Sequence, residues 1–162
     1  MLKKEMAKLL LRWANDPKVR ASSFSPNLIT RLDRHNGFRQ GLADPNRLLT
    51  IATAADGCPI GQVRFNRQPR STQDDFTEAT VDLSLDRCAR GFGLDGDLVR
   101  LGLQVMEKSW GPDIEAVAKV LTINAACNAC FSRAGFVQVS VSPVALPSRS
   151  MNRWRCRPAA LP

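Results

Sequence analysis

The sequence lacks tyrosine, has a single histidine and contains no long apolar run. No uninterrupted apolar stretch approaches the roughly 20 residues that a membrane-spanning helix needs. The first eleven residues mix three lysines and a glutamate with their apolar side chains, which is not the composition of a targeting segment. We therefore expect a protein without a membrane contact.

Cysteine occurs five times, an odd number scattered through segments that have the pattern of core or helix. This usage argues against a disulfide framework and favours a reducing, cytoplasmic location. Cys127 and Cys130 have the spacing of half a zinc site, but a structural zinc needs four ligands, and the sequence has no second pair or nearby histidine. We expect no metal and interpret both thiols as small helix residues.

Positive charge is in excess but dispersed. The formal net charge is +8 at pH 7, yet no block of five or six like charges occurs. A dispersed positive field steers a polyanionic small cofactor or a nucleotide-linked substrate as readily as nucleic acid. Charge alone does not choose between these partners.

The length of 162 residues and 44% hydrophobic content suit one α/β domain, for which we set the bounds 1–143. Residues 144–162 form a basic, proline-rich C-terminal tail that we expect to be only partly ordered. Hydrophobic periodicity, turn dipeptides and capping residues predict the elements of the domain. Helices are expected over 2–14, 31–42, 94–108 and 125–134, and strands over 48–54, 60–65, 79–85, 114–120 and 136–141.

Residues 90–96, Arg-Gly-Phe-Gly-Leu-Asp-Gly, lie between a predicted strand and a predicted helix. The amides of such a glycine-rich turn and the dipole of the following helix favour a bound anion. The turn therefore predicts a site for the pyrophosphate of a nucleotide-like cofactor.

This turn and residues 124–136 resemble two signatures of the GNAT N-acetyltransferase superfamily. They are Arg/Gln-x-x-Gly-x-Gly/Ala at a strand-to-helix turn and Asn-x-x-Ser leading to Gly-Phe. The resemblance covers about residues 9–141 and implies acetyl-CoA as cofactor. It also implies an α+β fold with a central mixed, mostly antiparallel twisted sheet and about four flanking helices. The first edge strand is apparently missing, because the sequence begins almost inside the first helix.

The resemblance implies which residues contact the cofactor. Amides around 83–85 would stabilise the carbonyl oxygen, amides of 92–96 with the Arg90 cation would hold the pyrophosphate, and Asn124 would bond the amide-bearing arm. Asp95 stands where the family has Gly or Ala, and Phe131 where it has a tyrosine that protonates the leaving thiolate. The predicted cofactor-binding residues are Leu83, Leu85, Arg90, Gly91, Phe92, Gly93, Leu94, Asp95, Gly96, Asn124 and Phe131.

A narrower resemblance concerns the acceptor. Residues 11–20, 35–38 and 59–65 are similar to the acetyltransferases that act on nucleotide-linked 4-amino-4,6-dideoxy sugars in pseudaminic-acid and related pathways. The resemblance implies that the sugar amine attacks the thioester directly. It also implies that the protein is a monomer or homodimer and has no nucleic-acid partner. Each of these side chains also has a purely structural interpretation: it can belong to the core, to the end of a helix or to the polar face of a sheet. The predicted substrate-binding residues are Arg12, Trp13, Asn15 and Arg64.

Two side chains are candidates for the catalytic proton acceptor. Asp82 lies on the polar face of the third predicted strand, and His35 is the only histidine; either can take a proton directly or through water. Asp82 is equally a solvent-facing strand residue, and His35 a packing residue. Two other functions stay open: acetylation of protein N-termini or a small amine, and a catalytically silent binding module of the same fold.

Overall fold

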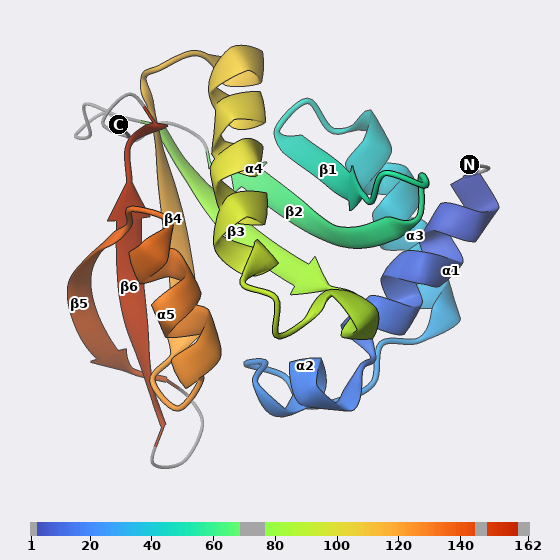
Figure 1. The fold of residues 1–162 in the computed structure, drawn as a ribbon, viewed down its shortest axis with the longest axis horizontal. Helices are drawn as coiled ribbons and strands as arrows, with labels where there is room; N and C mark the ends of the chain where they lie inside the picture. The colour runs from blue at the N-terminus through green and yellow to red at the C-terminus, as the bar shows by residue number, and fades with distance from the viewer. Residues whose placement is uncertain (1–2, 69–76, 145–148, 159–162) are drawn as a thin grey trace.

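The computed structural model describes residues 3–68, 77–144 and 149–158, with only the backbone of residues 3 and 34–36. The elements follow one another from the N-terminus (Figure 1). They are α1 (Lys3–Ala14), α2 (Pro17–Ala21), α3 (Arg31–Ala43), β1 (Arg47–Thr53), β2 (Pro59–Arg67), β3 (Thr77–Leu85), the 3-10 turn η1 (Arg87–Ala89), α4 (Leu94–Trp110), β4 (Ile114–Leu121), α5 (Ala125–Arg133), β5 (Val137–Pro143) and β6 (Ser150–Cys156).

The strands form one six-stranded sheet in the order β1-β2-β3-β4-β6-β5. Only β3 and β4 run parallel, and the other neighbours are antiparallel. This confirms the predicted mixed, mostly antiparallel sheet. Among the described residues, β1 and β5 are its edges, and no helix is both long and apolar enough to cross a membrane.

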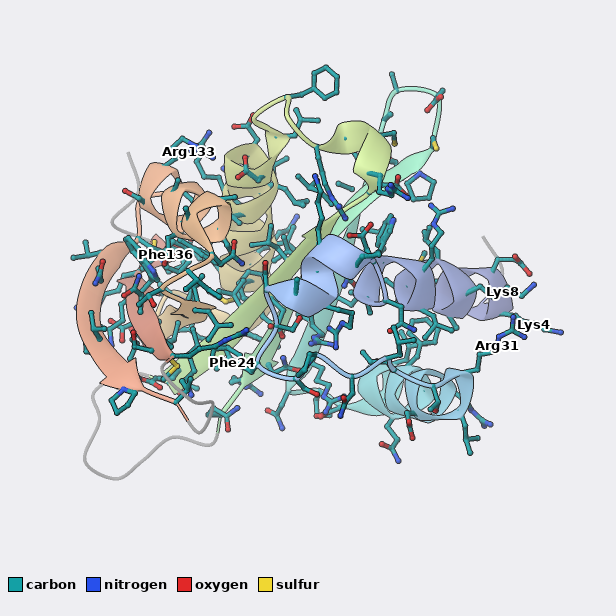
Figure 2. The ribbon with its side chains drawn as sticks, turned by 90° about the horizontal axis from the view of Figure 1, so that it is seen from below. Lys4, Lys8, Phe24, Arg31, Arg133 and Phe136 are labelled. Atoms are coloured by element: carbon teal, nitrogen blue, oxygen red, sulfur yellow. The ribbon has the colours of Figure 1, made fainter. Side chains whose placement is uncertain are left out.

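Helices cover the two faces of the sheet differently. Val63 and Phe65 of β2 are fully buried in the main core, against α4. Gly102 permits this close approach, because a Cβ there would lie 3.0 Å from Val63. The alternate residue Arg64 lines cavities on the opposite face, where α1 and α3 lie (Figure 2). The sheet therefore separates a dry α4–α5 layer from a more polar α1–α3 layer.

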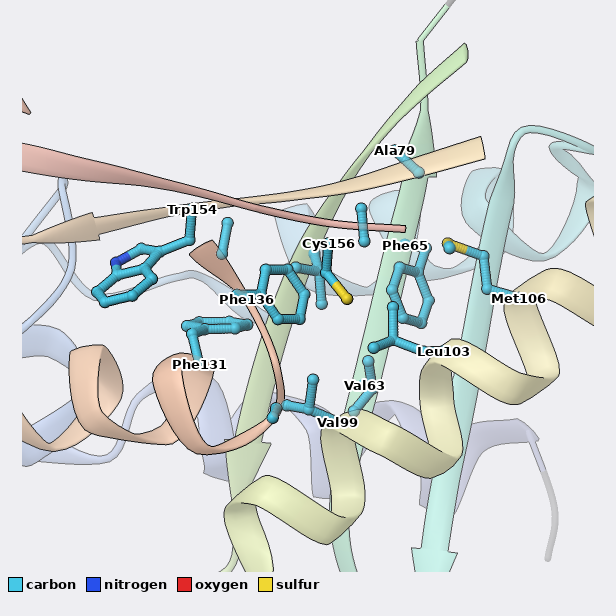
Figure 3. Packing of buried hydrophobic residues seen from close by; sticks show 14 of the residues in the cluster. Val63, Phe65, Ala79, Val99, Leu103, Met106, Phe131, Phe136, Trp154 and Cys156 are labelled. Atoms are coloured by element: carbon cyan, nitrogen blue, oxygen red, sulfur yellow. The ribbon is translucent and has the colours of Figure 1, made fainter. Parts of the chain in front are cut away.

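The core extends from α4 to α5 through aromatic contacts (Figure 3). Phe131 of α5 and Phe136 lie edge to face, with ring centroids 4.9 Å apart. Trp154 of β6 is also buried in this cluster. Its indole N–H donates to Asn128 Oδ1 at 2.9 Å, so the buried N–H group has a hydrogen-bond partner.

The predicted elements agree with the structure within a few residues, with two differences. The short helix α2 was not predicted, although Asp16 caps it and Pro17 opens it, as both residue types favour. The prediction of a partly ordered tail is wrong for residues 150–156, which form β6 between β4 and β5. In β6, Arg153 and Arg155 alternate with the buried Trp154 and Cys156. The charge of these arginines hides the strand pattern in the sequence.

Candidate functional site

The parallel strands β3 and β4 separate partway along their length. Their pairing runs from Thr77 opposite Ile114 to Thr80 opposite Val117. Beyond these residues β3 continues to Leu85, while β4 pairs only with β6 on its other side, within the described part of the chain. We call the two strand ends that do not pair with each other, residues 81–85 and 118–121, the β3–β4 fork (Figure 1).

The backbone N–H groups of β3 point alternately toward β2 and toward β4, and this alternation decides which of them face the fork. The Asp86 amide donates to Ile60 in β2 at 2.8 Å, whereas the Thr77 amide donates toward β4 at 3.3 Å. Successive strand residues direct their backbone groups alternately to the two neighbouring strands. The N–H groups of the odd-numbered Leu83 and Leu85 therefore point into the fork, and these are the two donors that the sequence predicted.

The glycine-rich turn between η1 and α4 leaves a helix N-terminus open. Gly93 caps α4 with φ of 74° and supplies no side-chain hydrogen bond. By contrast, side chains of Asp16, Thr30 and Asn124 cap α2, α3 and α5. The first amides of α4 lack acceptors within the helix, so the predicted turn has the open amides that a pyrophosphate requires.

Arg90 holds this turn in place. Its Nη1 lies 3.0 Å from Asp16 Oδ1, and its Nε and Nη2 donate to the Leu85 carbonyl at 3.1 and 2.9 Å. Burial alone would raise the pKa of Asp16, but the hydrogen bond and charge of Arg90 and two α2 amides lower it below the usual value. Arg90 thus positions the turn, and its contact with a pyrophosphate stays a prediction.

The predicted turn residues include a carboxylate, Asp95, at the start of α4. Its Oδ2 accepts a hydrogen bond from Arg133 Nη2 of α5 at 2.9 Å. The negative charge is therefore paired and directed toward α5, which lowers its repulsion of an anion at the turn. Gly96 is buried beside it, and Phe92 is 74% exposed.

At the other side of the fork, α5 presents Asn124 and Cys127. Asn124 Oδ1 caps the helix by accepting from the Cys127 amide at 3.2 Å. Burial, followed by the negative charges of Asp95 and Asp82, raises the pKa of Cys127 to about 12. Its thiol is neutral at physiological pH. Phe131 lies in the core, 2% exposed, and the cofactor contacts of Asn124 and Phe131 stay predictions.

Arg12 and Trp13, two of the residues predicted to bind substrate, contact the carboxylate of Asp86, which was not predicted as a site residue. Asp86 Oδ2 accepts from Arg12 Nη2 at 2.5 Å and from Trp13 Nε1 at 2.6 Å. Asn15 exchanges two 2.8 Å hydrogen bonds with the backbone of Ile29. Trp13 is 2% exposed, so the core interpretation describes it better than an acceptor wall. Asp86 follows a strand directly, the one signal that marked it in the sequence.

Arg64 and Asp82 form an ion pair across β2 and β3, with Arg64 Nη2 2.7 Å from Asp82 Oδ2. The Asp82 side chain is 57% exposed and lies at the start of the part of β3 that does not pair with β4. The structure thus brings together two predicted site residues from different strands. His35 lies in α3, but its side chain is outside the described residues.

Two cavities adjoin this pair. A cavity of about 140 Å³ between α1, α3, β1 and β2 is mainly apolar. A second, of about 450 Å³, is polar. Arg47 and Arg64 line both cavities, so they stand where the two meet.

Comparisons with known proteins show which solved structures share the fold of this chain. No family model matches the chain, and no curated protein sequence matches it. Among solved structures, spermidine N-acetyltransferase from Vibrio cholerae, in complex with CoA and spermine, is similar at a TM-score of 0.80 and 13% identity, covering 98% of this chain and 93% of that one. Aminoglycoside acetyltransferase AAC(6')-Ib with coenzyme A gives 0.75 and 18%, covering 97% and 91%. An acetyltransferase of the GNAT family from Streptococcus pneumoniae gives 0.71 and 14%, covering 96% and 95%. The chain has the fold of these acetyltransferases.

Proposed function

We propose that the protein is an acetyl-CoA-dependent N-acetyltransferase. The observation that carries this proposal is the β3–β4 fork, where the N–H groups of Leu83 and Leu85 face an unpaired strand edge next to the open start of α4. An extended ligand arm can add to such an edge like a strand, while its anionic part meets the helix N-terminus. The residues present therefore fit coenzyme A.

The turn at residues 91–96 would hold the pyrophosphate through backbone amides, and the fork would hold the amide-bearing arm. Acetyl-CoA, when bound, would supply the thioester carbonyl that the amine attacks. The amides of Leu83 and Leu85 would donate to that carbonyl oxygen. Arg90 and Asp95 act indirectly, because their charges are paired with Asp16 and Arg133.

Asp82 is the proposed proton acceptor for the attacking amine, directly or through water. Its partial exposure leaves it accessible, and Arg64 holds one carboxylate oxygen at 2.7 Å. Among the described side chains, the other carboxylate oxygen accepts no hydrogen bond, so it can face the amine. The neutral Cys127 thiol does not compete as a nucleophile.

For the acceptor, we propose the 4-amino group of a nucleotide-linked amino-deoxy sugar. The support is the similarity of residues 11–20 and 59–65 to enzymes of that class, with Arg64 beside Asp82. A small amine is the second candidate, since one structural neighbour was crystallised with spermine. The two differ in charge, which a panel of acceptors resolves.

The test begins with calorimetric titration of acetyl-CoA into the full chain, followed by a thiol-release assay. The acceptors are a UDP-4-amino sugar, spermidine and a peptide with a free N-terminus. Saturable binding with thiol release on the sugar supports the proposal. Absence of acetyl-CoA binding would overturn it, and binding without thiol release on any acceptor would favour a catalytically silent module.

A further inference from the structure

The larger cavity, of about 450 Å³, lies on the α1–α3 side of the sheet beside the Arg64–Asp82 pair. Its volume is in the range of small-molecule sites. Of the residues that line it, only Arg64 was a predicted site residue. The lining residues are Asp44, Arg47, Arg64, Asn66, Arg67, Gln68 and Thr80.

The lining carries more positive than negative charge. Its described residues include three arginines and one carboxylate, Asp44, whose Oδ2 lies 3.4 Å from Arg47 Nε, while Arg64 is paired with Asp82 at 2.7 Å. Arg67 contacts neutral groups instead: its Nε and Nη2 donate to Asn46 Oδ1 at 3.0 and 2.9 Å, and its guanidinium lies 5.1 Å from the centroid of the Trp110 ring. Such a surface favours an anion.

Arg47 and Arg64 are well placed to share that anion. Both line this cavity and the smaller apolar one. Arg47 lies against α3, since a Cβ added at Gly41 would be 3.4 Å from Arg47 Nη1. Arg64 lies at the cavity wall with its Nη2 2.7 Å from Asp82 Oδ2.

We propose that this arginine-lined cavity binds a phosphate or diphosphate group of the amine acceptor. The inference rests on the proposed acetyltransferase function and specifies its substrate as a phosphorylated amine. Thr80 lines the cavity and is two residues from Asp82, about 7 Å along an extended strand. An anion held there by Arg47 and Arg64 keeps the amine of the same small molecule within reach of Asp82.

The same charges disfavour a polycationic acceptor. An amine such as spermidine would bring its positive charges against Arg47, Arg64 and Arg67, and among the described residues only Asp44 in the lining and Asp82 beside it would offset them. Like charges within a few ångströms repel more strongly beside a protein surface than in bulk water. The charge of the cavity therefore favours a phosphorylated amine over a polyamine, a choice that the fold alone leaves open.

The experiment titrates inorganic pyrophosphate and UDP into the full chain previously saturated with CoA, so that the glycine turn is already occupied. Arg47→Gln and Arg67→Gln remove cavity charge, and Arg47→Lys retains it. Arg39→Gln, at an exposed site of α3 that lines neither cavity, is the control with the same change in net charge. Circular dichroism and thermal melting verify that each variant is folded.

We expect the CoA-saturated protein to bind both probes. Arg47→Gln should weaken the affinity about tenfold, Arg47→Lys less, and Arg39→Gln hardly at all. Absence of probe binding, or equal weakening in Arg39→Gln, would overturn the cavity assignment while leaving CoA binding intact. If CoA itself fails to bind, the proposed function fails, and the Arg47 dependence in the CoA-free protein still decides whether the cavity binds an anion.

Discussion

Arg90 and Asp16 join the glycine turn to the start of α2 through an ion pair of 3.0 Å. The Asp16 side chain is 7% exposed and also caps α2, while Arg90 reaches back to the Leu85 carbonyl. One guanidinium thus links the turn, the end of β3 and the N-terminal helices.

Replacing this cation should cost stability. Arg90→Gln leaves the Asp16 carboxylate buried without its cation, so we expect the free energy of unfolding to fall by about 1–3 kcal/mol in urea denaturation. Arg87→Gln is the control, because Arg87 is 85% exposed and 3.8 Å from Asp16; it should change stability by less than about 0.5 kcal/mol. Equal losses in the two variants would contradict the positioning role of Arg90.

Acid should destabilise the protein through Asp86. Burial would raise its pKa, but hydrogen bonds from Trp13, from Cys88 and from Arg12 outweigh burial and lower the pKa well below 3.8. A depressed carboxyl pKa contributes stability above the unfolded-state value, and this contribution is lost as the pH falls through the folded-state value.

The free energy of unfolding, measured in urea between pH 6 and 3, should therefore decrease below about pH 4. Asp86→Asn should be less stable at pH 6 and show a flatter decrease. Glu5→Gln, an exposed change in α1, should keep the wild-type slope. A wild-type slope in Asp86→Asn would show that other carboxyls cause the acid sensitivity.

Gly93→Ala tests the open start of α4. At φ of 74° an alanine costs about 1 kcal/mol, and the strained turn should bind CoA more weakly in calorimetry. Gly37→Ala is the matched control, since a Cβ there has no neighbour within 4 Å and a helical alanine is favoured. Unchanged CoA affinity in Gly93→Ala would remove the turn from the cofactor site.

Asp82→Asn tests the proposed proton acceptor. Loss of a general base lowers kcat/KM by about 10²–10⁴-fold, whereas CoA affinity and melting temperature should change little, because the side chain is 57% exposed. A displaced pH–rate profile would distinguish this role from a structural one. Glu5→Gln serves as the control, and wild-type turnover in Asp82→Asn would exclude Asp82.

Native cysteine reactivity should follow burial. Cys127, with its pKa raised to about 12, and the buried Cys130 should resist iodoacetamide at pH 8, because the thiolate is the reactive form. The exposed Cys58 and Cys88 should be alkylated first, and mass spectrometry of the labelled peptides reports the order. Early labelling of Cys127 would mean that the fork opens more than this structure indicates.

The sequence analysis succeeded where the signal was local. The elements predicted from capping residues and turn dipeptides are the clearest cases: Thr30 caps α3, Asp56-Gly57 lies in the turn between β1 and β2, and Gly135 follows α5 with a positive φ. It failed for β6, because arginine and proline dominate the composition of the C-terminal segment. It also missed Asp86, whose partners Arg12 and Trp13 lie more than 70 positions away.

By itself, the sequence determined most helices, most strands and the glycine turn at residues 91–93, because capping, periodicity and positive φ depend on near neighbours. Only the tertiary structure decided that β3 leaves β4 after Thr80, that Arg90 is paired with Asp16, and that Arg47 and Arg64 meet beside a cavity. These features depend on which distant segments pack together, and no local pattern encodes the distance between two side chains on different strands.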